Sequence, residues 1–160
     1  MAAAVHRRFP RTRFVMVGDG SLKAEAERLA HSLGLAEAMT FCGWWDDIPG
    51  LLAATDVSVL TSRHEGLPCS VVESLAAGVP VVATAVDGTV EVVRPGVNGF
   101  LAPAGDIRAL ADHVCAILEK PELKRQLAAA APEHLEDFDV SVMVRQLEDL
   151  YRCIGPMSHS

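Results

Sequence analysis

DVSVLTSRHEGLPCSVVESLAAGVPVVA, residues 56–83, is the stretch from which the fold can be predicted. It begins with a short apolar run, Asp56–Leu60, which is typical of a buried strand. After a polar loop, proline at the first helical position favours a helix over Pro68–Ala77, with a glycine directly after it. A second apolar run, Val79–Ala83, follows at once. This order predicts two parallel strands joined by a crossover helix.

The same alternation extends in both directions along the chain. Further strands are expected at Phe14–Val17, Met39–Phe41 and Gly99–Leu101. One further helix, capped by Ser21, should extend to Leu33; a second should extend from Asp46 or Asp47 to Ala53; and a third, capped by Asp106, should extend to Glu119. The tail over about 121–155 is expected to be helical, with breaks near Pro132 and 137–139. The strands are continuous apolar runs, so both faces of the sheet should be covered. We therefore predict an α/β fold with one doubly wound parallel sheet.

The first ten residues are predicted to be the end of a helix, with arginine and histidine in its last turn. An α/β domain rarely opens with a helix that has no strand before it. We therefore expect a first strand upstream of residue 1. At about 150 residues per domain, residues 1–160 are expected to form a single domain.

Composition excludes several classes of function. Half of the 160 residues are hydrophobic, which supports a packed core, and the net charge of −7 argues against nucleic acid as a partner. No apolar run approaches the roughly 18–20 residues of a membrane span, and the opening residues contain no signal-peptide core. We expect a cytoplasmic protein.

The cysteine pattern favours neither a metal site nor a redox motif. Cys42, Cys69, Cys115 and Cys153 form no C-x-x-C pair, and no histidine pair stands four residues apart. Two disulfides are possible, but free thiols in a reducing compartment are the favoured interpretation.

Ligands of such sheets bind outside the carboxyl ends of the strands, which directs attention to the loops at 18–21, 42–47, 61–69 and 84–91. Gly18 and Gly20 could bring the backbone close to an anion, or could serve only a tight turn. The dinucleotide-binding pattern is not met, because Lys23 stands where a third glycine is required.

The loop and helix over 62–73 carry the strongest chemical signal. Glu65 lies in the loop and Glu73 lies eight positions later in the helix. The amides of Cys69, Ser70 and Val71 are expected to be unpaired at the helix start, where they could bind a diphosphate. The two carboxylates could accept hydrogen bonds from sugar hydroxyls. The alternative is that both glutamates are solvated surface residues.

Two other pairs near these loops have open roles. Arg63 and His64 could bind phosphate, although solvation is favoured. Trp44 and Trp45 could stack on a base or pack against the short helix that follows them.

The stretch Glu65–Thr84 resembles the E-x7-E signature of retaining glycosyltransferases of family 4, the glycosyl transferases group 1. Other motifs of that family occur in order along positions 14–151. They are V-G-D-G at Val17–Gly20, F-x-G at Phe41–Gly43, D-V at Asp56-Val57, N-G-F-L at Asn98–Leu101 and P-x-G-D at Pro103–Asp106.

The resemblance implies the C-terminal, Rossmann-like donor-binding domain of a GT-B fold, without the N-terminal acceptor domain. By the family pattern, Glu73 holds the ribose hydroxyls of a nucleotide-diphosphate sugar and Glu65 is the catalytic residue at the donor sugar. The other implied donor-binding residues are Gly18, Gly43, Trp44, Gly66, Leu67, Pro68, Cys69 and Ser70. No metal and no cofactor besides the donor substrate are implied.

This chain departs from the family pattern in three ways. The family binds the diphosphate with an Arg and a Lys in a G-R-L…K-G segment, which would precede Met1. The acceptor domain lies outside residues 1–160, so this chain alone is expected to be inactive. Finally, Asp87 stands where a Gly-Gly pair is usual, and it adds a negative charge near the donor.

The implied function is transfer of a sugar, with retention of configuration, to an acceptor hydroxyl in polysaccharide or glycolipid synthesis. The expected partners are the nucleotide sugar and the N-terminal domain, and any membrane association would come through that domain. Exposed apolar surface could let the chain self-associate. Two alternatives remain open: a non-enzymatic nucleotide-binding module that pairs with a separate acceptor chain, and a nucleotide-sugar epimerase of the related fold.

Overall fold

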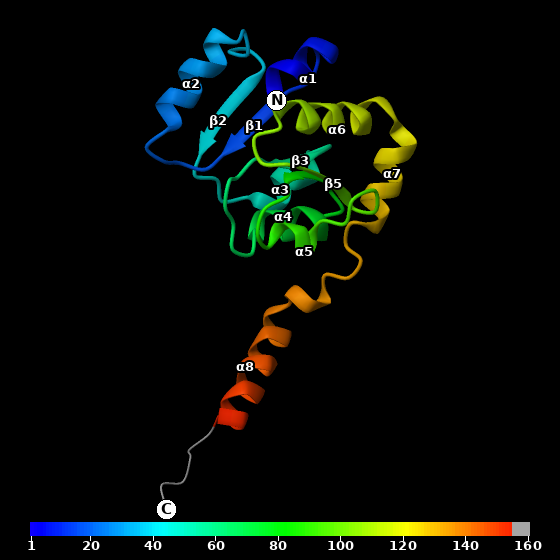
Figure 1. Ribbon diagram of the computed structural model, residues 1–160. Helices are drawn as coiled ribbons and strands as arrows, with labels where there is room; N and C mark the ends of the chain where they lie inside the picture. The colour runs from blue at the N-terminus through cyan, green and yellow to red at the C-terminus, as the bar shows by residue number, and fades with distance from the viewer. Residues whose placement is uncertain (155–160) are drawn as a thin grey trace, which may run out of the picture.

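The computed structural model describes residues 1–154. Its strands are β1 (Phe14–Val17), β2 (Met39–Gly43), β3 (Ser58–Leu60), β4 (Val81–Thr84) and β5 (Gly99–Ala102). Its helices are α1 (Ala2–Arg8), α2 (Lys23–Ser32), α3 (Ile48–Ala53), α4 (Cys69–Ala76), α5 (Thr89–Val92), α6 (Ile107–Glu119), α7 (Pro121–Ala130), the 3-10 helix η1 (Glu136–Phe138) and α8 (Val140–Ile154). The predicted alternation of strands and helices is confirmed (Figure 1).

Strand β4 is buried on both faces. Val82 packs into a core cluster with residues of α1, α6 and α7, whereas Val81 and Ala83 pack into a second cluster with residues of α4 and α5. Successive side chains of a strand point to opposite faces, so these two clusters lie on opposite sides of the sheet. The expected α/β fold with helices on both faces is therefore confirmed.

The strands form two parallel ladders rather than the single sheet that was predicted. One ladder is β1–β2, the other has the order β3–β4–β5, and no pairing within residues 1–154 joins them. The prediction that every strand is buried is wrong for β1, whose Val15, Met16 and Val17 are 50%, 44% and 38% exposed. β1 has a partner strand on its β2 side only, so its other edge lies open.

Most expected helix starts are confirmed, because a cap is a local interaction. The carboxylates of Asp47 and Asp106 accept hydrogen bonds from the N–H groups of Gly50 and Ala109, at 2.8 and 2.9 Å. The expected cap at Ser21 is wrong. Helix α2 begins at Lys23 without a side-chain cap, since a turn over residues 20–23 precedes it.

The C-terminal tail is helical and broken where predicted, and only residue 155 of the expected span lies outside the described residues. Helix α8 contains no buried residue and projects away from the body of the protein (Figure 1). None of the described helices is both long and apolar enough to cross a membrane.

Candidate functional site

Four loops follow the carboxyl ends of the strands, and hydrogen bonds join them in two pairs. The Gly18 N–H donates to the carbonyl of Gly43 at 2.7 Å, which joins the loops after β1 and β2. The Thr84 hydroxyl donates to the carbonyl of Ser62 at 2.6 Å, which joins the loops after β4 and β3. The four segments that the parallel order brings to the carboxyl ends of the strands are therefore held together in two pairs.

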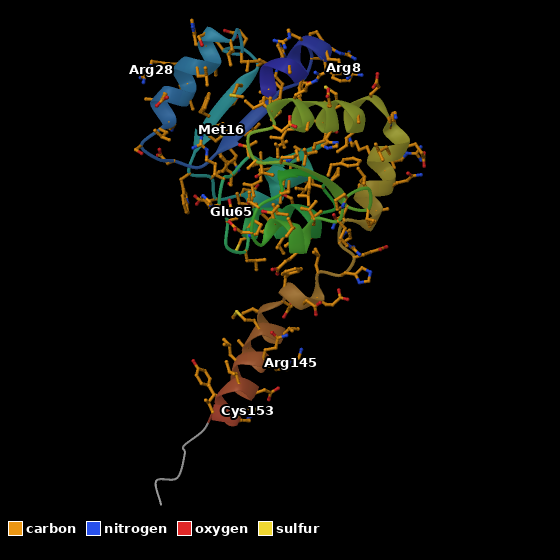
Figure 2. The ribbon with its side chains drawn as sticks, in the orientation of Figure 1. Arg8, Met16, Arg28, Glu65, Arg145 and Cys153 are labelled. Atoms are coloured by element: carbon orange, nitrogen blue, oxygen red, sulfur yellow. The ribbon has the colours of Figure 1, made fainter. Side chains whose placement is uncertain are left out.

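Glu65 is half-buried in the loop between β3 and α4 (Figure 2). Its backbone N–H donates to Oδ2 of Asp87 at 2.9 Å, and Nδ1 of His64 lies 3.8 Å from the same oxygen. Asp87 thus anchors the loop that presents Glu65. The sequence placed Asp87 near the donor as an added negative charge, but not as a hydrogen-bond partner of this loop.

The loop around Glu65 also packs backbone against backbone on the turn before α5. A Cβ atom added at Gly88 would stand 2.1 Å from the carbonyl oxygen of Gly66. No side chain fits at that distance. Asp87, the residue before Gly88, has a positive φ of 39°.

The N-terminus of α4 presents free backbone donors. The buried Pro68 is the N-cap of α4, one position before the first helical residue that was predicted for it, and its carbonyl accepts hydrogen bonds from the N–H groups of Val71 and Val72. The prediction that the Val71 amide is unpaired is therefore wrong. The amides of Cys69 and Ser70 precede the first helical hydrogen bond, as predicted, and both residues are exposed.

Glu73 is exposed on the second turn of α4, beside α3. It lines a pocket of about 280 Å³ together with Ile48, Pro49 and Leu52. The hydroxyl of Ser74 fixes the helix in place, because it hydrogen-bonds to the Ser70 carbonyl and to the Ser58 hydroxyl of β3. The fold therefore places Glu65 in the loop before α4 and Glu73 within that helix.

Gly18 and Gly43 have φ values of 118° and 65°, so the turn interpretation of Gly18 is supported. Nζ of Lys23 lies 3.2 Å from the position of a Cβ atom at Gly43, and this cation was not predicted as part of the site. The one signal for it was its place three residues after Gly20, at the start of α2.

The two tryptophans have different environments. Nε1 of Trp45 donates to the Asp47 carbonyl at 3.0 Å, which ties this ring to the start of α3. Trp44 is 82% exposed and available for stacking. Arg63 and His64 are exposed, in line with the favoured solvation. The four cysteines are free, and among residues 1–154 no three His, Cys, Asp or Glu side chains gather closely enough to hold a metal ion.

Comparison with known proteins gives a consistent family assignment. The family model described as glycosyl transferases group 1 matches residues 1–134. The lipopolysaccharide core biosynthesis glycosyltransferase LpsE of Rhizobium meliloti is 36% identical over 128 residues, which are 80% of this chain and 38% of LpsE. The alpha-D-kanosaminyltransferase of Streptomyces kanamyceticus is 32% identical over 157 residues, 96% of this chain and 41% of that protein.

The fold is also found in solved structures. HepE of Anabaena, in complex with UDP, superposes with a TM-score of 0.86 at 30% identity, covering 94% of this chain and 43% of HepE. This chain spans about two fifths of the length of LpsE and of the kanosaminyltransferase. The family model covers most of the chain and its matched region includes both glutamates, so the chain belongs to the family glycosyl transferases group 1.

Proposed function

We propose that this chain forms the nucleotide-sugar-binding half of a retaining glycosyltransferase, which moves a sugar from a nucleoside diphosphate to an acceptor hydroxyl. The observation that carries the proposal is the arrangement at α4, where Glu65 and Glu73 flank two free backbone amides. The likeness to the UDP complex of HepE supports it, because the superposition covers nearly the whole chain.

The N-terminus of α4 is suited to a diphosphate. The amides of Cys69 and Ser70 can donate hydrogen bonds, and the helix dipole adds partial positive charge at the same end. A diphosphate gains negative charge when the sugar bond breaks. Donors already fixed at this position stabilise that charge without reorganising, which lowers the barrier.

The two carboxylates suit the two sugars of the donor. Glu73, beside the pocket against α3, can accept hydrogen bonds from the vicinal ribose hydroxyls with its two oxygens. Glu65 contacts the donor sugar, and Asp87 holds the backbone that carries it. The remaining loop residues, Gly66 and Leu67, bring the main chain close to the same sugar.

The loops after β1 and β2 are suited to contact the base and to offset the negative charge of the donor. Trp44, exposed after Gly43, offers a ring for the base. Lys23 adds a positive charge beside Gly43, which offsets part of the repulsion between a chain of charge −7 and an anionic donor. We propose that no metal takes part and that residues outside 1–160 supply the acceptor site.

The first experiment is titration of the chain with UDP, GDP and ADP, followed through amide chemical shifts. Saturable shifts at Cys69, Ser70 and Glu73 are expected for one of the three nucleotides. Glu73→Gln should weaken that binding about 10- to 150-fold, the loss expected for hydrogen bonds to a charged group. Glu27→Gln, an exposed change on α2, is the matched control and should leave the affinity unchanged.

The second experiment tests transfer in the intact enzyme. Glu65→Ala should abolish turnover while nucleotide binding persists, and the product of the unchanged enzyme should keep the anomeric configuration of the donor. Equal turnover in Glu65→Ala, or nucleotide binding that does not respond to Glu73→Gln, would contradict the proposal. Conversion of the donor sugar to its epimer without an acceptor would favour the epimerase instead.

A further inference from the structure

Residues 131–139, here termed the connector, join α7 to α8 and pack on the face of the sheet that carries α4 and α5. Only three residues of the connector are not exposed: Ala131 is buried, and Leu135 and Phe138 are half-buried. All three pack into the apolar cluster that covers this face of β4. Figure 1 shows the connector, in orange, running below α4 and α5.

The same cluster contains the inner face of α4. Val71 and Leu75 of this helix are buried in it, and Val92 and Val93 bring the end of α5 into it. The connector, α4 and α5 therefore share one apolar core. Because α4 carries the free amides and the second glutamate of the candidate donor site, that site and the connector depend on the same helix.

Hydrogen bonds join the connector to the end of α5. Nη2 of Arg94, two positions after α5, donates to the carbonyl of Glu133 at 3.0 Å. Asn98, which is buried, holds Arg94 in place: its Oδ1 accepts from the Arg94 N–H at 2.8 Å, and its Nδ2 donates to the Val92 carbonyl at 3.1 Å. Helix α5 follows directly on the turn that holds the loop of Glu65. The connector is thus joined to both parts of the candidate site.

Neither α4 nor α5 is long enough to be stable by itself. They span Cys69–Ala76 and Thr89–Val92, and isolated helices shorter than about 12–15 residues are marginal in water. Their order therefore depends on the burial of their apolar faces. Leu135 and Phe138 lie at the outer side of that buried cluster, since the residues around them are exposed. Truncating either side chain leaves the cluster incompletely packed and eases local opening of both helices.

We propose that the connector positions the donor site, through Leu135, Phe138 and its hydrogen bond from Arg94. These contacts hold α4 and α5 in the geometry that binds the donor, and backbone amides bind an anion best when they are fixed beforehand. The inference rests on the proposed function, because the site concerned is the donor site at α4. If the connector served only the stability of the whole chain, a half-buried leucine on the other face of the sheet would matter equally.

A matched pair of leucine substitutions tests this role. Leu135→Ala should raise the Kd of the nucleotide that the unchanged chain binds by about 2- to 30-fold, the range for residues that act on a site through packing. It should also speed amide exchange at Val71 and Val72, whose N–H groups make the first hydrogen bonds of α4. Leu135→Met conserves the volume and should restore both quantities.

Leu123→Ala is the matched control. Leu123 is also half-buried, but it packs into the cluster on the opposite face of the sheet, with residues of α1 and α6. The control should leave the Kd and the exchange at Val71 and Val72 unchanged. Equal changes in Leu135→Ala and Leu123→Ala would overturn the proposal, because the effect would then follow global stability.

A surface variant keeps the test decisive if Leu135→Ala fails to fold. Arg94→Met removes the hydrogen bond to Glu133 and leaves the cluster intact. It should speed exchange at Val93, whose N–H donates to the Thr89 carbonyl of α5, and unchanged exchange there would overturn the proposal. If the unchanged chain binds none of UDP, GDP and ADP, the proposed function fails, whereas exchange at Val93 still decides whether the connector holds α5.

Discussion

Asp87 connects two loops that lie 22 positions apart in the sequence, through the 2.9 Å hydrogen bond from the Glu65 N–H. It also occupies a backbone conformation, φ 39°, that asparagine and aspartate tolerate better than most residues. We propose that this residue positions Glu65 by accepting the hydrogen bond from its backbone N–H.

Replacing Asp87 tests this positioning role. In the intact enzyme Asp87→Ala should lower kcat about 2- to 10-fold, the loss expected for one hydrogen bond, and should speed amide exchange at Glu65. Asp87→Asn keeps an acceptor oxygen and the same φ preference, so it should restore both quantities. Equal exchange at Glu65 in all three proteins would show that the contact does not order the loop.

Gly88 tests the close approach between the same two loops. Gly88→Ala should destabilise the chain by about 1–3 kcal/mol, because the added Cβ would stand 2.1 Å from the Gly66 carbonyl oxygen. Gly20→Ala is the control, since no atom lies within 4 Å of that Cβ position and its φ is not positive. Urea unfolding of the two variants should separate them, and equal midpoints would refute the packing argument.

At the scale of elements, helices α4 and α8 differ in what holds them. Leu75 of α4 is fully buried in the cluster that covers one face of β4. Helix α8 is amphipathic in sequence, yet it has no buried residue, and its Leu147 is 43% exposed. Burial of an apolar face, rather than helical periodicity, supplies most of a helix's contribution to stability.

This difference in burial predicts that a leucine-to-alanine substitution lowers the free energy of unfolding much more in α4 than in α8. Leu75→Ala should destabilise the chain by about 2–5 kcal/mol, because it opens a cavity in the core. Leu147→Ala should change stability by less than about 0.5 kcal/mol, the usual range for a surface site. Thermal unfolding of the two variants measures the difference. A comparable loss at Leu147 would mean that α8 packs against another surface in solution.

At the scale of the whole molecule, the two ladders should open separately. The β1–β2 ladder has a small buried cluster, formed by Ala30, Leu35 and Ala38. The β3–β4–β5 ladder has two larger clusters, which share the fully buried strand β4 between them. Native-state hydrogen exchange in increasing denaturant should therefore show β2 amides opening at lower free energy than β4 amides. A single common opening energy would contradict this division.

Much of this protein can be predicted from its sequence, because the signals concerned are local. Continuous apolar runs, glycines after helices and aspartate caps predict the elements within a few residues, and Asp47 and Asp106 cap their helices as expected. The same local signals predict that Glu65 precedes α4 and that Glu73 lies within it. The exception is Ser21, whose expected cap was displaced by a turn that no composition pattern distinguishes.

The tertiary structure decided what depends on segments far apart in the chain. Two contacts depend on the packing of loops against one another: the hydrogen bond between Glu65 and Asp87, and the position of Lys23 beside Gly43. No local sequence pattern predicts which loops come into contact. The division into two ladders is of the same kind. An apolar run shows that a strand will form, but its burial depends on which strands lie beside it. That is why β1, as apolar as β4, has an open edge while β4 is buried on both faces.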